Sequence, residues 1–270
     1  MLILTGDPIG PRLASHGIRV WNMAVELSGA HDVRLLTTSR AERTDPRFEV
    51  AAVAAGDSAA FAPLEAWADV IIVHGAGYIA FPALRRTSTP LVADAYGPMV
   101  LEHLEFDRHL PPEQAEPEVA HSAWIVNELL TRADYVLVAS ERQRLYVLGC
   151  LSALGRINPL TYGDDATLGE LVGIVPFGLS PEPPRHDRPA LRGVVPGIGA
   201  DDTVLIWSGG IYNWFDPETL IRAVAEVAAR HDDIRLFFLG TVHPSPEVPE
   251  MPVITASRRL AAELGVAGRH

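Results

Sequence analysis

The sequence contains no lysine, because all 22 of its basic residues are arginine. This absence excludes Schiff-base chemistry through a lysine and the phosphate-binding lysine of a P-loop. An anionic ligand must therefore be held by arginine, by backbone amides or by the N-terminus of a helix.

Cysteine and long apolar runs are also scarce. The single cysteine, Cys150, excludes an internal disulfide and a cysteine metal cluster, and its apolar neighbours predict a buried, inert thiol. No apolar run approaches the length that spans a membrane, and the first residues lack the basic flank of a signal peptide. These features together favour a cytoplasmic protein.

Several common site types are missing as well. No GxGxxG fingerprint follows a strand, and the pattern contains neither a Ser-His-Asp arrangement nor a cluster of metal ligands. We therefore expect no cofactor and no metal. The net charge of -12 argues against nucleic acid as a partner.

The first 180 residues alternate short apolar runs with amphipathic segments. This alternation predicts an α/β fold with a parallel sheet and helices on both faces. Residues 102–118 and 159–167 lack clear periodicity, and we expect a solvated loop or broken helix in the first and a loop in the second. Strands are predicted at 2–4, 32–37, 48–51, 69–74, 90–94, 135–138 and 171–175, with helices from Gly17, at 78–86, at 120–132 and from about 141 to 154.

The proline-rich segment 181–200 predicts a linker between a first domain, residues 1–180, and a second, residues 201–270. The second begins with an apolar strand, two glycines that suit a turn, and a helix with Asp216 as its cap. A further strand at 234–240 completes a βαβ unit. Two strands make only the start of a Rossmann-like domain, so we expect this domain to be incomplete.

Four sets of segments, in this order, resemble the family-four glycosyltransferases of the two-Rossmann-domain (GT-B) type. The match covers a first-strand loop, a later strand end, the last strands of the acceptor domain and the start of the donor domain. The segments are 10–21, 92–98, 134–141 with 175–178, and 207–220 with 238–241.

The resemblance implies transfer of a sugar from a nucleotide-sugar donor to a carbohydrate or lipid-linked acceptor, with retention of anomeric configuration. The leaving phosphate would then take the acceptor's proton, so that neither a metal nor a protein nucleophile is required. The family's paired glutamates, in a Glu-x7-Glu segment, are absent from these 270 residues, so we expect this chain alone to be inactive. Many members of the family hold the diphosphate with an arginine and a lysine in the loop after the first strand of the donor domain. The corresponding loop here, residues 209–214, contains neither.

Two other functions fit the same pattern. A nucleotide-sugar epimerase shares the two-domain build, and the incomplete second domain would suit a non-catalytic binding or assembly subunit. Peripheral contact with a membrane and self-association through the second domain are further candidates for partners.

Seven residues are candidates for binding the donor or another substrate: Gly17, Arg19, Ser140, Glu141, Gly209, Gly210 and Trp214. Arg19 would neutralise the phosphate charge, and Gly17 would let the ligand come close to the backbone. The alternative is that Arg19 is an ordinary surface arginine and Gly17 an ordinary turn glycine. Gly209 and Gly210 follow an apolar run and would let a ligand approach the backbone. Trp214 would stack on a base or a sugar, or pack beside the helix cap.

Strand ends supply the remaining candidates. His74 would bind a sugar hydroxyl or act as a base, and Asp94 and Tyr96 occupy the loop that contacts the transferred sugar in the family. We expect replacement of His74 or Asp94 by alanine to cut turnover and leave the melting temperature nearly unchanged. Ser140 and Glu141 end a third strand, where capping of the next helix is the favoured interpretation.

Overall fold

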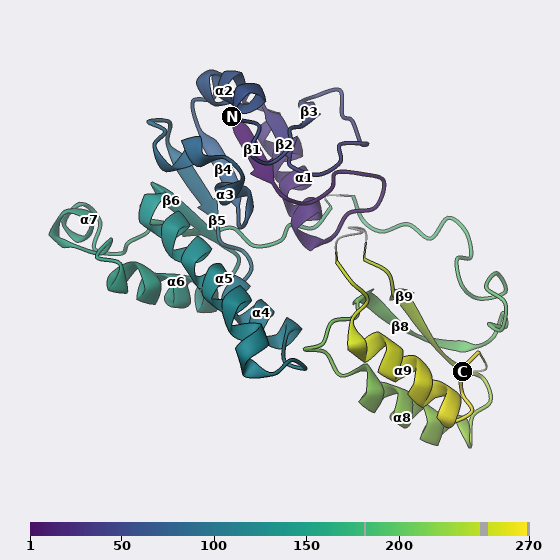
Figure 1. The fold of residues 1–270 in the computed structure, drawn as a ribbon. Helices are drawn as coiled ribbons and strands as arrows, with labels where there is room; N and C mark the ends of the chain where they lie inside the picture. The colour runs from purple at the N-terminus through teal and green to yellow at the C-terminus, as the bar shows by residue number, and fades with distance from the viewer. Residues whose placement is uncertain (181, 244–247, 269–270) are drawn as a thin grey trace. The chain divides into compact units, whose positions relative to one another are not determined.

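The computed structural model describes residues 1–180, 182–243 and 248–268. Its contacts divide the chain into two units, Met1–Gly178 and Leu179–His270. Figure 1 shows a larger unit with a broad sheet and a smaller unit with strands and helices of its own.

The first unit contains a seven-stranded sheet in which all paired strands are parallel, as predicted. The strand order is β3-β2-β1-β4-β5-β6-β7, so the direction of winding reverses between β1 and β4. Open parallel sheets bind ligands at such a reversal, beyond the carboxyl ends of the strands. The strands are β1 Leu2–Thr5, β2 Arg34–Thr37, β3 Glu49–Ala52, β4 Ile71–His74, β5 Leu91–Asp94, β6 Tyr135–Val138 and β7 Val172–Ile174.

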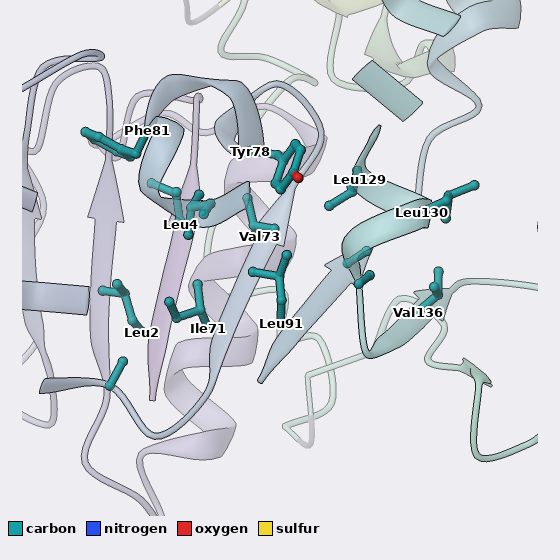
Figure 2. Close-up of a cluster of buried hydrophobic side chains, with 14 of the residues drawn as sticks. Leu2, Leu4, Ile71, Val73, Tyr78, Phe81, Leu91, Leu129, Leu130 and Val136 are labelled. Atoms are coloured by element: carbon teal, nitrogen blue, oxygen red, sulfur yellow. The ribbon is translucent and has the colours of Figure 1, made fainter. Parts of the chain in front are cut away.

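The central strands are mostly apolar because helices cover both faces of the sheet. Leu2 and Leu4 point into one core cluster, shown in Figure 2 with Tyr78 and Leu129 from the covering helices. Ile3 points the opposite way, into a second cluster with Trp21. The helices of this unit are α1 Ser15–Leu27, α2 Ser58–Trp67, α3 Gly77–Ala80, η1 Pro82–Arg85 (a 3-10 helix), α4 Met99–Phe106, α5 Pro112–Arg132, α6 Glu141–Ala153 and α7 Pro159–Asp164.

Helix boundaries differ from the prediction in two places. The region expected as a loop or a broken helix is a broken helix, because α4 ends at Phe106 and α5 begins at Pro112 and includes Pro117. Asn158 caps α7 through a capping box in the segment expected as a loop. The helix predicted over 78–86 is divided at Phe81, because a residue before proline is driven towards extended backbone. Cys150 on α6 is partly exposed rather than buried.

The pairing of β6 with β7 includes a close fit between a large and a small residue. Leu137 lies opposite Gly173, and the ring of Tyr135 covers the space beside that glycine. A Cβ atom at position 173 would collide with the Tyr135 hydroxyl and lie 2.9 Å from its Cζ. Glycine is therefore required for this side chain to lie against β7.

The second unit pairs β8 Thr203–Gly210 with β9 Ile234–Gly240 in parallel, and α8 Pro217–Ala228 connects them as predicted. Gly209 and Gly210 lie within the end of β8, so the expected glycine turn is wrong. Asp216 caps α8 by accepting a hydrogen bond from the amide of Thr219 at 3.0 Å, which confirms that prediction.

The core of the second unit is small. The helix α9 Pro252–Glu263 packs on α8, and the buried members of the core cluster between them are Ile221, Leu260 and Val266. Leu236 and Phe238 of β9 pack against this cluster, whereas the opposite face of the strand pair carries Ile206 and Leu239, 54% and 64% exposed. Part of the predicted linker belongs here, since Arg235 donates to the carbonyl of Gly197 at 2.8 Å.

Candidate functional site

A pocket of about 70 Å³ lies in the first unit, beyond the carboxyl ends of β4 and β5. Its position near the reversal of strand order is the expected place for a ligand in a parallel sheet. His74 and Asp94 are paired neighbours at the ends of these strands, so two of the predicted residues come together here. The polar residues of the lining are His16, His74, Asp94, Glu102, Gln143 and Tyr146.

Two histidine rings are packed together at the polar end of this pocket. The ring centroids of His16 and His74 are 4.0 Å apart, and the ring of Tyr96 meets His16 edge-on at 5.5 Å. Burial, followed by the neighbouring His16 and Arg19, lowers the pKa of His74 well below its usual value. His74 is therefore neutral at physiological pH and can exchange hydrogen bonds with a hydroxyl group.

Arg19 and Asp94 form a buried ion pair between α1 and β5. Nε of Arg19 donates to Asp94 Oδ1 at 3.0 Å and to Oδ2 at 2.8 Å, and the side chains are 3% and 1% exposed. Burial raises the pKa of Asp94, while the guanidinium acts in the opposite direction. Asp94 is thus held by Arg19 rather than projecting freely towards a substrate.

The remaining nitrogens of Arg19 bear on its predicted role as a phosphate ligand. Nη1 donates to the carbonyl of Val175 at 2.8 Å, and the guanidinium lies over the rings of Tyr96 and Phe177. Nη2 is buried without a hydrogen-bond partner in the described residues. Binding of phosphate by Arg19 stays a prediction, and Nη2 is the atom on which it now depends.

The loop after β5 is held firmly in place by Gln143 of α6. Its amide nitrogen donates to the carbonyl of Tyr96 at 2.6 Å, and its amide oxygen accepts from the backbone of Ala139 at 2.6 Å. The amide of Met99 donates to the carbonyl of Gly97 at 3.0 Å. Burial raises the pKa of Tyr96, so its phenol keeps its proton at neutral pH.

Gly17, Ser140 and Glu141 have structural partners. The amide of Gly17 donates to Asp7 Oδ2 at 2.9 Å, and a Cβ at this position would contact Leu13 at 3.4 Å. Ser140 caps α6 by accepting from the amide of Gln143, which confirms the capping interpretation. The carboxylate of Glu141 lies 3.6 Å from Arg144, one turn along the helix.

Gly209, Gly210 and Trp214 belong to the second unit. Trp214 stacks on Tyr212 with ring centroids 4.7 Å apart, and a Cβ at Gly210 would lie 2.8 Å from the Tyr212 ring. Trp207 donates from its indole to the carbonyl of Gly210 at 3.1 Å. These contacts form an aromatic group around the end of β8, and their role in donor binding stays a prediction.

Sequence reasoning did not select His16, Asp7, Glu102 or Gln143 as site residues. His16 immediately precedes Gly17, and its Nδ1 lies 3.9 Å from Asp7 Oδ2. A useful signal was available, since Asp7 and His16 lie in and just after the loop that follows the first strand. Loops at the carboxyl ends of parallel strands carry binding residues, so polar side chains there merit selection.

In the described part of the chain, no group of three histidine, cysteine, aspartate or glutamate side chains is placed to hold a metal ion. None of the helices there is long and apolar enough to cross a membrane.

The lowered pKa of His74 predicts a loss of stability in acid. Below a pH of about 6.5 the unfolded chain protonates this imidazole while the folded chain does not, so the free energy of unfolding falls as the pH drops. We expect His74→Asn to reduce the decrease in melting temperature between about pH 7.5 and pH 5.5. The same change at the exposed His31 serves as the control. If the melting temperatures of His74→Asn and of the unmodified chain fell by the same amount over this pH range, the lowered pKa of His74 would be contradicted.

No protein-family model and no curated protein matches the chain. Among solved structures, it aligns with Os79 from O. sativa in complex with UDP over 96% of its own length and 71% of that chain, at 16% identity and a TM-score of 0.43. Os79 with UDP and deoxynivalenol-3-glucoside aligns over 97% and 70%, at 16% identity and a TM-score of 0.40. The calicheamicin glycosyltransferase CalG4 aligns over 93% and 68%, at 17% identity and a TM-score of 0.36. These similarities assign no activity, donor or acceptor to this chain.

Proposed function

We propose that the protein is a retaining glycosyltransferase of family four, which moves a sugar from a nucleotide-sugar donor to a hydroxyl group of an acceptor. The observation that carries the proposal is the pocket of the first unit, where the closely packed rings of His16 and His74 lie beyond the strand ends. Imidazole nitrogens at such a place suit the binding of hydroxyl groups. The ordered segments that resemble the family support the same assignment.

The arrangement of Asp94 supports a mechanism without a protein nucleophile. Its carboxylate is bound by Arg19 and almost completely buried, so it is poorly placed to attack a sugar carbon. In the proposed reaction the departing phosphate oxygen takes the acceptor's proton, and the sugar bond forms on the face that the phosphate leaves. The contribution of this unit is then to position the acceptor hydroxyl, which lowers the entropic cost of reaction.

Donor binding is proposed for the second unit. The exposed rings of Trp214 and Phe215 lie near the start of α8, whose first turn supplies backbone amides and a positive dipole. A nucleotide base would stack on the aromatic rings while the diphosphate approaches the amides. The absence of lysine from the whole chain makes backbone amides and arginine the available phosphate ligands.

The proposal predicts turnover of a sugar nucleotide that depends on an acceptor. We expect the complete product of the gene to release nucleotide from UDP- or GDP-sugars when an acceptor is present, and His74→Ala to reduce that rate by about 100-fold. His31→Ala is the matched control, since this histidine is exposed on the loop after α1. A coupled nucleotide-release assay with a panel of acceptors measures both rates.

Each alternative gives a different result in this assay. Nucleotide or isomerised sugar formed equally well without acceptor would identify an epimerase. Absence of turnover with every donor, in a protein that still binds sugars, would support a binding or assembly subunit. Unchanged turnover in His74→Ala would remove this pocket from the reaction.

A further inference from the structure

We infer that the second unit holds a binding site for a small, neutral aromatic molecule with one hydroxyl group, of the phenol class, in a pocket between α8 and α9. The pocket has a volume of about 170 Å³, and its lining comes from these helices, from β9 and from the residues that follow α9. The inference goes beyond the proposed function, because it concerns neither the sugar donor nor its acceptor. Trp214 and Phe215, to which stacking on the base is ascribed there, lie outside the lining.

The wall of the pocket is apolar and largely shielded from water. Ile221 and Val224 of α8 and Ile254 of α9 line it, and each is 5% exposed or less. Leu236 and Phe238 of β9 line it from the side of the sheet. Close packing of a protein core normally leaves few voids larger than a water molecule. An opening of this volume among core residues therefore has room for a ligand.

The volume suits a single six-membered ring with a small substituent. An apolar cavity of about 150 Å³ in a folded protein stays dry and takes up benzene. The present pocket is slightly larger, and Phe238 is one of its lining residues. The ring of Phe238 already contacts the ring of Trp207, with centroids 5.8 Å apart. A bound aromatic ring would extend this group of rings, which favours an aromatic ligand over an aliphatic one.

Ser257 of α9 points to a polar group on the ligand. It lines the pocket, is 5% exposed, and its hydroxyl has no hydrogen-bond partner in the described residues. A serine inside a helix can donate to the carbonyl one turn earlier, and Ser257 does not. Buried polar atoms are nearly always paired, because leaving one unpaired is costly. A hydroxyl group on the ligand can donate to this oxygen or accept from it, and so supplies the missing partner.

Water is a poor occupant of this pocket. A buried water molecule needs about two to four polar partners. Among the described residues of the lining, Ser257 is the one buried polar side chain, whereas Thr241 and Arg258 are more exposed. A molecule that pairs with the Ser257 hydroxyl at one end and presents carbon atoms to the remaining wall satisfies both parts of the pocket.

The charges beside the pocket favour a neutral ligand. Nη1 of Arg258 donates to the two carboxylate oxygens of Glu250 at 3.1 Å and 2.9 Å. The same carboxylate accepts from the hydroxyl of Thr255 at 2.9 Å. The charge of Arg258 is therefore already compensated, and a carboxylate on the ligand would compete with Glu250 for it. A phenol, which keeps its proton at neutral pH, avoids this competition.

The test measures the binding of two fluorinated probes to the 270-residue chain by fluorine NMR. The probe para-fluorophenol carries the hydroxyl group, and fluorobenzene has the same ring without it. Ala261→Leu fills the pocket from α9, and Val224→Ile adds a single methyl group from α8. Ala262→Leu is the matched control, because Ala262 lies on the same helix, is exposed and is outside the lining. Ser257→Ala removes the hydroxyl alone.

We expect para-fluorophenol to bind the unmodified chain and Ala262→Leu equally. Binding should be weaker by about tenfold or more in Ala261→Leu, and by a smaller factor in Val224→Ile, because the added carbon atoms occupy the space of the ring. Ser257→Ala should weaken the binding of para-fluorophenol by about threefold to tenfold, the effect of one hydrogen bond, and leave that of fluorobenzene unchanged.

Stability provides a second measurement of the same site. A ligand that binds only the folded chain stabilises it by mass action. Saturating para-fluorophenol should therefore raise the melting temperature of the unmodified chain and of Ala262→Leu, but not that of Ala261→Leu. The melting curves also show whether each variant is folded, and Val224→Ile, the smaller change, decides the question if Ala261→Leu is not.

Three results would overturn the inference. The first is the absence of binding by para-fluorophenol, and a raised melting temperature of Ala261→Leu would then show that the pocket is only a packing defect. The second is unchanged binding in both Ala261→Leu and Val224→Ile, which would place the ligand elsewhere. The third is an equal effect of Ser257→Ala on the two probes, which would leave the hydroxyl without a role. None of these measurements depends on sugar transfer, so the proposed function and this site can fail separately.

Discussion

Replacement of Arg19 by methionine is expected to lower the free energy of unfolding by about 3–5 kcal/mol. The change leaves the carboxylate of Asp94 almost completely buried without its guanidinium partner, and removing one member of a buried ion pair exposes the full desolvation cost of the other. The carbonyl of Val175 also loses a donor. Methionine retains most of the length and the apolar stem of arginine, so packing is disturbed little.

A double-mutant cycle measured by urea unfolding separates the interaction energy of Arg19 with Asp94 from the effect of each substitution on other contacts. We expect Arg19→Met with Asp94→Leu to recover much of the loss, because no buried charge then remains. Arg34→Met, which breaks a more exposed pair with Glu49, is the control and should cost about 1 kcal/mol or less. A loss below about 1 kcal/mol in Arg19→Met would show that Asp94 is neutralised or hydrated in another way.

The separated second unit, Leu179–His270, is expected to have no cooperative unfolding transition. Its sheet has two strands, and a pair of this kind is marginal in water even when a helix covers it. Ile206 and Leu239 are exposed on the face away from the helices, so the apolar strands bury little surface. The edges of both strands also present open backbone donors and acceptors.

Hydrogen exchange and solution mass provide the measurement. We expect the amides of β8 in the separated unit to exchange almost as rapidly as in an unfolded chain, or the unit to associate. The first unit, Met1–Gly178, prepared in the same way, is the control and should unfold cooperatively because its seven-stranded sheet is covered on both faces. Strong protection of β8 in a monomeric second unit would contradict the prediction.

Most of the strands were predictable because they are short apolar runs next to helical segments, and the burial of the central strands on both faces makes that pattern clear. The starts of α5 and α7 were not, since neither depends on apolar periodicity. The first turns of α5 lie in an acidic, proline-containing stretch, and α7 is short and begins with the side chain of Asn158. A capping contact depends on a single side chain, so the local amino-acid composition gives only a weak indication of where such a helix begins.

The candidate site was predictable in position and only in part in its chemistry. His74 and Asp94 were selected as residues at strand ends, and the pairing of β4 with β5 brings them together. The ion pair joins Arg19 and Asp94, which are 75 positions apart in the sequence. The sequence pattern predicts a phosphate ligand for Arg19 and a sugar ligand for Asp94, and it carries no signal that the two side chains bind each other. The expectation that Asp94→Ala leaves the melting temperature unchanged is reversed by this burial, whereas the same expectation for His74 stays a prediction.

The close fit of Tyr135 over Gly173 has a consequence for how this sequence can drift. A side chain at position 173 meets the phenol on the neighbouring strand, so Tyr135 must first turn away or become smaller. The reverse order leaves an empty space on β7, which is a milder defect. The order in which the two positions change therefore matters, and homologous chains with a side chain at position 173 should carry a residue smaller than tyrosine at position 135.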